Sequence, residues 1–357
     1  MIIIVGAGPA GLALGYELKL RGRAFRILER ERVGAAWHHH YDRLHLHTRK
    51  GVSSLPGMPM PRSYPAFPDR RQVASYFADY AARFDLPVEI GVTVSHASWD
   101  GVVWRLDTSK GRRRATHLVA ATGIWSAPYR PRIPGEETFG GPIIHSASYR
   151  APAPYRGQRV LVVGVGNSGA EIAVDLASGG TQTSIAVRSG AAFVARQRST
   201  IAAHGIALAL RALPRRLTTH LIHRRNFAGI GLPPPPGSPI DHYPVVGYDL
   251  PDAVTRGDIE VCGSLERLSL GAAHFTDGRS ATFDAVILAT GFRPAIDWLD
   301  GGVTVDARGR PLVDTHWRAR NNRHLTCIGY HYPTTEGWLQ ALPRVARLAA
   351  AGIIGSD

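Results

Sequence analysis

The chain opens with the stretch IIIVGAGPAG, residues 2–11, and this stretch decides the fold. Its first four residues, 2–5, are apolar and mostly β-branched, which predicts a short buried strand. The strand leads directly into the pattern G-x-G-x-x-G. Gly6 permits a tight turn, and Gly8 permits a close approach of the backbone to a pyrophosphate. Gly11 permits close packing of the next helix on the strand. We therefore expect the loop to bind the phosphates of a dinucleotide through Gly6, Gly8, Pro9, Ala10 and Gly11.

A second strand and an acid follow at the spacing that such a loop requires. Residues 25–28 predict the strand, and Glu29 stands at its end, 29 − 6 = 23 residues after the first glycine. An acid at this distance accepts hydrogen bonds from an adenosine ribose. The strand, the helix and the acid together predict dinucleotide binding far more strongly than the glycines alone.

The same pattern returns in the middle of the chain. A strand at 159–163 leads into GVGNSG at 164–169, a helix follows, and a second strand covers 182–187. This strand ends in Arg188 and Ser189, where the first unit has an acid. An arginine and a hydroxyl suit the 2′-phosphate that an acid would repel, so the first loop suits FAD and the second suits NADPH rather than NADH.

These two units predict an α/β fold with two Rossmann-like dinucleotide-binding domains, the NADPH domain inserted into the FAD domain. We expect the FAD domain to comprise residues 1–150 and 291–357, and the NADPH domain residues 151–290. Two Ala-Thr-Gly runs, at 121–123 and 289–291, follow predicted strands and would mark the crossings between the domains. A helix from about 336 to 351 should return to the first domain and place its N-terminus near the flavin.

The remaining segments are less regular. We expect a folded-over proline-rich loop at 55–68, a helix at 72–84 capped by Asp69, and a proline-rich linker at 124–157. The segment 201–227 has helical periodicity with one basic face, and we interpret it as part of a lid at about 196–250 rather than as a membrane-surface helix. Further strands are predicted at 88–95, 102–108, 116–123, 259–262, 281–288 and 325–329.

Composition narrows the class of protein. The 357 residues are 44% apolar and 20% charged, which is typical of a globular protein, and we expect no leader, no membrane span and a cytoplasmic location. The net charge is +14, but the basic residues are scattered, so nucleic acid is not an expected partner. The two cysteines form no C-x-x-C pair, which argues against a redox dithiol. Five histidines lie between His38 and His47, and we expect them to form a polar wall along a cofactor rather than a metal site, since three adjacent side chains cannot converge on one ion.

The motifs together resemble the class B flavin-dependent monooxygenases, and within them the YUCCA-type indole-3-pyruvate monooxygenases and their bacterial relatives. The stretch FGGPIIHSASY, residues 139–149, fits the family identifier F-x-G-x-x-x-H-x-x-x-[Y/F] just before the second glycine loop. The run GVGNSGAE at 164–171, the run LATGF at 288–292 and the segments 41–65 and 229–262 are similar as well. The chain departs from the family at residues 34–37, where Gly-Ala-Ala-Trp replaces Gly-Gly-Thr-Trp.

The resemblance implies a reaction and a set of site residues. NADPH would reduce the flavin, O₂ would add to give a C4a-(hydro)peroxide, and one oxygen atom would pass to a small substrate: a sulfide, an amine or an arylpyruvate-like acid. The candidate catalytic residues are His145, His47 and Tyr149. His47 stands about where some relatives carry an asparagine near the flavin, whereas His145 and Tyr149 would fix the linker near NADP⁺ rather than act as acid or base. The further cofactor-binding candidates are Arg30, Trp37, Val94, Thr122, Gly164, Gly166, Asn167, Ser168, Gly169 and Gly291.

Two alternatives stay open at this point. A relative of the pyridine nucleotide-disulfide reductases shares the two nucleotide units but needs a dithiol beside the flavin. A flavoprotein that acts as an NADPH oxidase or redox sensor would carry the same loops without productive oxygenation. The substrate, and whether the chain forms a homodimer, do not follow from the sequence.

Overall fold

The structure is a computed structural model that describes residues 1–197, 199, 205, 209, 213, 214, 216, 217, 225–235, 242–301, 303–331 and 336–355. The chain divides into two compact units. Unit 1 comprises Met1–His39, Thr48–Ala127 and Phe292–Asp357, and unit 2 comprises His40–His47 and Pro128–Gly291. Unit 2 therefore interrupts unit 1 twice in the sequence, once by a short segment and once by a long one.

Unit 1 is built on a six-stranded sheet with the strand order β21-β22-β7-β1-β2-β3. The central strands run parallel, and only the short edge strand β21 is antiparallel to its neighbour. The bounds are β1 Ile2–Val5, β2 Phe25–Glu29, β3 Val88–Ile90, β7 His117–Ala120, β21 Arg318–Ala319 and β22 Asn322–Cys327. All four residues of both β1 and β7 are buried, as expected for central strands of a parallel sheet that is covered on both faces.

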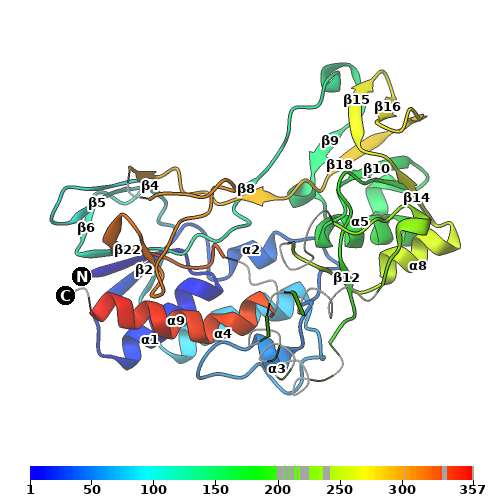
Figure 1. Ribbon diagram of the computed structural model, residues 1–357. Helices are drawn as coiled ribbons and strands as arrows, with labels where there is room; N and C mark the ends of the chain where they lie inside the picture. Colours follow the sequence, from blue (N-terminus) through cyan, green and yellow to red (C-terminus); the bar gives the residue numbers. More distant parts are fainter. Residues whose placement is uncertain are drawn as a thin grey trace. The chain divides into compact units, whose positions relative to one another are not determined.

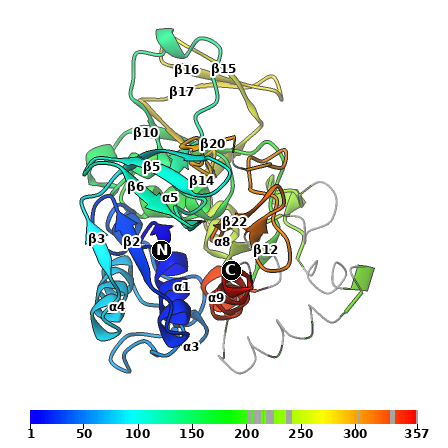
Figure 2. The same cartoon turned by 90° about the vertical axis from the view of Figure 1, so that its left-hand side faces the viewer.

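Helices cover one face of this sheet and a second sheet covers the other (Figures 1 and 2). The helices are α1 Pro9–Leu20, α2 Ala35–His38, α3 Lys50–Ser53, α4 Arg70–Arg83 and α9 Trp338–Ile354. The second sheet has the order β20-β4-β5-β6, with bounds Leu299–Asp300, Val94–Trp99, Trp104–Thr108 and Arg113–Ala115. Buried Trp104, Leu106 and Ala97 from this sheet form one core with Leu118 and Val5.

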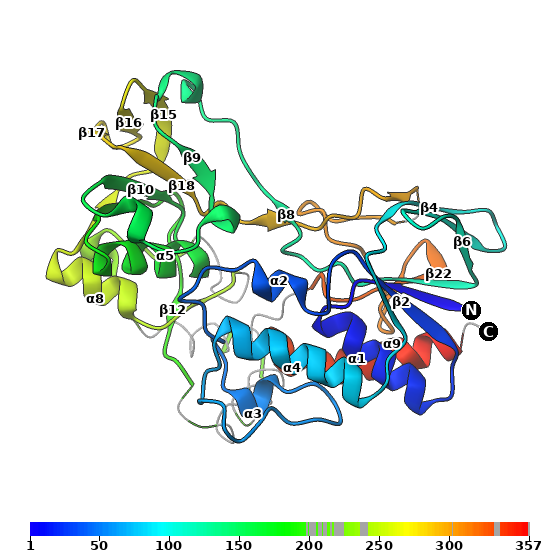
Figure 3. The same ribbon diagram turned by 180° about the vertical axis from the view of Figure 1, so that it is seen from behind.

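Unit 2 is built on a five-stranded, fully parallel sheet with the order β14-β11-β10-β18-β9. The bounds are β9 Ile143–His145, β10 Arg159–Val163, β11 Gln182–Ala186, β14 Ile259–Cys262 and β18 Ala285–Leu288. The helices α5 Asn167–Ser178 and α8 Asp249–Arg256 pack together at this sheet (Figure 3). A small antiparallel sheet packs on it through a core that joins Leu161 and Val286 to Phe275, and its strands are β15 Leu265–Ser269, β16 Ala272–Phe275 and β17 Ser280–Thr282.

Short elements complete the two units. Strands β12 Phe193–Val194 and β13 Val245–Val246 pair in parallel in unit 2. Strand β8 Ala127–Pro128 lies at one crossing between the units and β19 Phe292–Arg293 at another. The 3₁₀ helices are η1 Glu136–Thr138, η2 Ser146–Ser148, η3 Ala153–Tyr155 and η4 Ala228–Ile230.

Several local predictions are confirmed. The strands and helices around both glycine loops are present, and the helix at 70–83 begins with the predicted Asp69 cap. Asp69 accepts a hydrogen bond from Gln72 N at 2.8 Å, and the Gln72 side chain accepts one from Asp69 N at 3.0 Å. The C-terminal helix α9 packs against α1 in unit 1, as the topology predicted.

Other predictions were wrong in their bounds. The predicted strand 88–95 is two strands, because Gly91 turns the chain with a φ of +70°. The predicted strand 281–288 is also two, β17 and β18. The stretch 124–157 is not only a linker: Ile143–His145 forms the edge strand β9 and pairs with β18. This pairing places residues 128–150 in unit 2, whereas the sequence suggested the first domain.

Most of the helical segment 201–227 of the predicted lid at about 196–250 lies outside the described residues, so its helical character stays a prediction. In the described part of the chain, no helix is both long and apolar enough to cross a membrane.

Candidate nucleotide-binding sites

The first glycine loop connects β1 to α1 in unit 1, and its three glycines have different surroundings. Gly6 has a φ of +110°, and a Cβ there would lie 2.6 Å from the carbonyl oxygen of Ala121. A Cβ on Gly11 would lie 2.0 Å from the Gly6 carbonyl oxygen, so the helix can approach the strand only without a side chain. A Cβ on Gly8 would meet nothing within 4 Å. The loop is therefore packed at its two ends and open in the middle, which fits a pyrophosphate that approaches the backbone at Gly8.

Glu29 lies against this loop. One of its carboxylate oxygens accepts a hydrogen bond from Ala7 N at 2.8 Å, and the other accepts one from Glu31 N at 3.0 Å. Each carboxylate oxygen can accept more than one hydrogen bond, so the group keeps capacity for ribose hydroxyls. The backbone thus fixes the acid beside the glycine loop, and these residues fit an FAD adenosine.

Two further segments of unit 1 meet at the same loop. Thr122 follows Ala121, whose carbonyl group lies next to Gly6. The Thr122 hydroxyl is hydrogen-bonded to the Tyr330 hydroxyl at 2.7 Å. A Cβ on Gly329 would lie 3.0 Å from the Ala10 Cβ, so the chain after β22 passes close to the first turn of α1. Sequence reasoning did not identify Tyr330, although it follows directly after a predicted strand.

The remaining candidates of unit 1 lie in other settings. Arg30 pairs with Glu31 at 3.3 Å on the surface. Trp37, in α2, packs edge-on against Phe77 with ring centroids 6.3 Å apart. Val94 begins β4 and packs against the core of the unit. Their roles toward FAD stay predictions.

The second glycine loop, between β10 and α5 in unit 2, repeats the geometry of the first. Gly164 has a φ of +108°, and its Cβ would lie 2.7 Å from the Ala289 carbonyl oxygen. A Cβ on Gly169 would lie 1.9 Å from the Gly164 carbonyl oxygen, whereas one on Gly166 would meet nothing within 4 Å. This loop also fits a pyrophosphate.

The strand ends differ between the two loops. Arg188 and Ser189 are exposed and follow β11 after one intervening residue, where the first unit has the hydrogen-bonded Glu29. An exposed guanidinium and hydroxyl at this point fit a 2′-phosphate.

Asn167 organises the backbone beside the second loop. Its side-chain amide donates to the Pro244 carbonyl at 2.9 Å and accepts from Val246 N at 3.0 Å. The amide of Asn167 thus holds residues 244–246 next to the loop, and the predicted role of Asn167 toward the cofactor stays a prediction.

His145 is buried at the end of β9, and both ring nitrogens have partners. Nδ1 accepts a hydrogen bond from Ala147 N at 3.1 Å, so Nε2 donates to the Gly291 carbonyl at 3.0 Å. Burial lowers the pKa of His145, which keeps the ring neutral at neutral pH. The ring thus fixes the backbone where the chain leaves unit 2, and a neutral, fully bonded imidazole is poorly suited to proton transfer.

Tyr149 and His47 both bond to acids of α5. The buried Tyr149 hydroxyl donates to Asp175 at 2.8 Å, and burial raises its pKa. His47 Nε2 lies 3.1 Å from one carboxylate oxygen of Glu171, and the other carboxylate oxygen accepts a hydrogen bond from the Tyr41 hydroxyl at 2.6 Å. Sequence reasoning did not single out Glu171 and Asp175 as site residues, although two acids four residues apart on one helix are a detectable signal.

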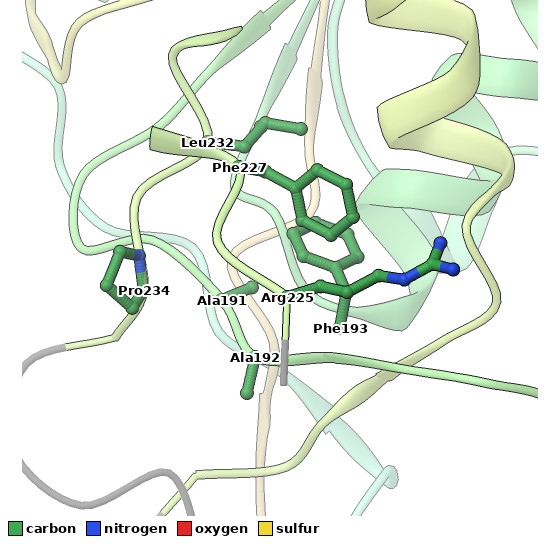
Figure 4. A pocket seen from close by; sticks show the side chains of 7 residues that line it. All are labelled: Ala191, Ala192, Phe193, Arg225, Phe227, Leu232 and Pro234. Atoms are coloured by element: carbon green, nitrogen blue, oxygen red, sulfur yellow. The ribbon is translucent and has the colours of Figure 1, made fainter. Parts of the chain in front are cut away.

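The hollow in Figure 4 lies in unit 2 and is lined mainly by apolar side chains. Phe193 and Phe227 meet edge to face in its wall, and the Arg225 guanidinium lies 4.3 Å from the Tyr248 ring centroid. Its volume is only about 10 Å³, which is room for about one water molecule, so this hollow does not hold a substrate in the form described. Among the described residues, no three His, Cys, Asp or Glu side chains gather as a metal site.

Comparison with known proteins identifies the family. The model of the family described as pyridine nucleotide-disulphide oxidoreductase matches residues 3–204. The indole-3-pyruvate monooxygenase YUCCA1 of Oryza sativa subsp. japonica is 36% identical over 92% of this chain and 86% of its own length. The indole-3-pyruvate monooxygenase YUCCA6 of Arabidopsis thaliana is 37% identical over 83% of this chain and 77% of its own. The chain belongs to the flavin-dependent monooxygenases.

Solved structures agree with this assignment. A flavin-containing monooxygenase from Stenotrophomonas maltophilia superposes with a TM-score of 0.80 at 30% identity, over 99% of this chain and 98% of that one. A bacillithiol disulfide reductase from Staphylococcus aureus has a TM-score of 0.75 at 16% identity, which is a likeness of fold alone. The predicted family and the α/β fold with two Rossmann-like parts are confirmed, as is the prediction of a flavin monooxygenase enzyme. FAD and NADPH are the cofactors of this family, and their prediction is confirmed at that level.

Proposed function

We propose that this flavin monooxygenase binds FAD at the Gly6–Gly11 loop and NADPH at the Gly164–Gly169 loop, and that it transfers one atom of O₂ to a small organic substrate. The observation that carries the assignment is the contrast between the two strand ends. Glu29 is held beside the first loop by Ala7 N, whereas Arg188 and Ser189 are exposed beside the second. This contrast supports a ribose at the first loop and a 2′-phosphate at the second.

Bound FAD supplies the electron transfer and the activation of oxygen. The chain's own residues bind and orient the two nucleotides. The open backbone at Gly8 and Gly166 and the amides that follow would hold the two pyrophosphates. His145 and the Thr122–Tyr330 pair hold backbone segments near the two loops, and we assign them a positioning role. We keep His47 and Tyr149 as site residues that act through α5 rather than as acids or bases.

We propose an arylpyruvate-like 2-oxo acid as the first substrate class to test, because the relatives at 36% and 37% identity carry the name indole-3-pyruvate monooxygenase. Sulfides and amines, which accept an oxygen atom as soft nucleophiles, are the second class.

The test is a substrate screen that measures NADPH consumption, oxygenated product by mass and hydrogen peroxide in the same reaction. We expect one class to give product in proportion to NADPH consumed. Hydrogen peroxide equal to NADPH under every substrate would instead indicate an oxidase or redox sensor.

A further inference from the structure

Residues 40–47, which we call the strap, come from the first part of the chain but pack within unit 2. Their neighbours in sequence, His39 and Thr48, belong to unit 1. The chain therefore leaves unit 1 for the eight residues of the strap and then returns to it. Specific contacts are needed to hold so short a segment in unit 2.

Those contacts are concentrated on one face of α5. Glu171 accepts the Tyr41 hydroxyl at 2.6 Å and lies 3.1 Å from His47 Nε2. One turn further along, Asp175 lies 3.9 Å from the Arg43 guanidinium. Three strap side chains therefore bind two acids four residues apart on the helix.

The strap is also fixed to the segment that follows β9. Asp42 N donates to the Arg150 carbonyl at 2.9 Å, and the ring centroids of Tyr41 and Tyr149 lie 6.2 Å apart. Tyr41 is 4% exposed, so its hydroxyl lies away from solvent. Its hydrogen bond to Glu171 is therefore stronger than the same bond would be in water.

The strap contacts lie close to the nucleotide loop along the chain. Glu171 is the fifth residue of α5 and stands two residues after Gly169, the last glycine of the G-x-G-x-x-G run. No side chain forms a capping hydrogen bond at the N-terminus of α5, and a Cβ on Gly166 would meet nothing within 4 Å, so the contacts at Asn167 and Glu171 orient this part of the helix.

The helix after the first loop has no acid at the position that corresponds to Glu171. The residue at the position of Glu171, five after the middle glycine, is the buried Ala13 in α1. Of the two glycine loops, only the loop of unit 2 is thus followed by an acid at this position, one turn into the helix.

We propose that the strap is a positioning element for the pyridine nucleotide: Tyr41 and His47, both through Glu171, set the first turn of α5 and so the affinity for NADPH. This rests on the proposed binding of NADPH at the Gly164–Gly169 loop. It assigns Tyr41 and Glu171 as positioning residues, and it places the action of His47 on the nicotinamide cofactor rather than on the flavin.

The test compares Tyr41→Phe and Glu171→Gln in the FAD-loaded enzyme with Tyr155→Phe as the matched control, since Tyr155 stacks on Tyr149 in the same unit. We expect KM for NADPH to rise about 10-fold in both variants, the effect of one hydrogen bond to a charged group. The kcat at saturating NADPH and the FAD-to-protein ratio should stay near those of the parent. His47→Gln, which keeps an N–H donor, should retain more NADPH affinity than His47→Ala.

Two results would overturn the proposal. One is an unchanged KM for NADPH in Tyr41→Phe and Glu171→Gln while Arg188→Ala weakens NADPH. The other is a parallel fall of NADPH affinity, FAD content and kcat in both variants, which would indicate a purely structural strap. If Arg188→Ala and Gly166→Ala both leave NADPH binding intact, the proposed function has failed instead.

Discussion

The two glycine loops share a backbone and differ in the side chains around it. In each loop the first glycine has a positive φ, the last is packed against the carbonyl of the first, and the middle one is open. The differences lie at the strand end, Glu29 against Arg188, and one turn into the helix, Ala13 against Glu171. The shared backbone therefore accounts for the binding of a pyrophosphate, whereas the identity of each nucleotide depends on a few side chains outside the glycine run.

The largest effect should come from the packed glycines. We expect Gly11→Ala and Gly169→Ala to destabilise their units by about 3 kcal/mol or more, because the new Cβ would lie within 2.0 Å of a backbone oxygen. Gly8→Ala and Gly166→Ala should keep the parent's unfolding free energy but lose nucleotide affinity, since their φ values of −79° and −73° suit any residue. Denaturant unfolding measures the stability of all four variants, FAD content measures the nucleotide affinity of Gly8→Ala, and titration with NADPH measures that of Gly166→Ala. Equal stability in all four variants would contradict the division into packed and open positions.

The next effect concerns the strand end of the second loop. Arg188→Ala should weaken NADPH about 10- to 100-fold, the range for charge-assisted hydrogen bonds to a phosphate, and leave NADH unchanged. Arg256→Ala is the control, since that arginine is exposed in the same unit and pairs with Asp258. Titrations of both nucleotides against each variant give the ratio. Equal losses for NADPH and NADH would place the 2′-phosphate elsewhere.

A smaller effect should follow at the strand end of the first loop. Glu29→Gln keeps the shape of the side chain but removes the charge that accepts from Ala7 N and Glu31 N. We expect FAD to dissociate about 10-fold faster, because the ribose loses a charged acceptor. Arg26→Gln, at an exposed residue of the same strand that pairs with Glu89, is the control, and the release of flavin fluorescence on dilution reports the rate. A faster release from Arg26→Gln than from Glu29→Gln would contradict the assignment of the ribose.

The sequence alone predicted those parts of the fold in which a local residue pattern determines the backbone. Strand, glycine loop, helix and acid follow one another in short range, so both nucleotide units could be predicted with their elements. The strap could not be predicted, because its contacts join residues 124 to 130 positions apart and no local pattern relates Tyr41 or His47 to Glu171. Strand β9 was missed for a related reason, since a three-residue strand becomes visible only through its partner β18.

The smallest effect lies within the acid pair of α5 and separates its two members by the sign of their pH dependence. Burial opposes ionisation of Glu171, but the hydrogen bonds from His47 and Tyr41 together with the charge of His47 hold its pKa below 4.5. Glu171 thus stabilises the fold above its unfolded pKa, and this stabilisation is lost as the pH falls through the folded value. Burial instead raises the pKa of Asp175 above 3.8, so Asp175 destabilises the fold increasingly as the pH rises through the folded value.

Unfolding free energies measured from about pH 3 to about pH 7 test this contrast. Glu171→Gln should lose less stability than the parent on acidification. Asp175→Asn, which keeps an acceptor for Tyr149, should gain stability over the parent as the pH rises. If both substitutions changed the pH dependence of stability in the same direction, the contacts from the strap would not offset the burial of Glu171. The hydrogen bonds of Tyr41 and His47 to Glu171 would then be weaker than their geometry indicates.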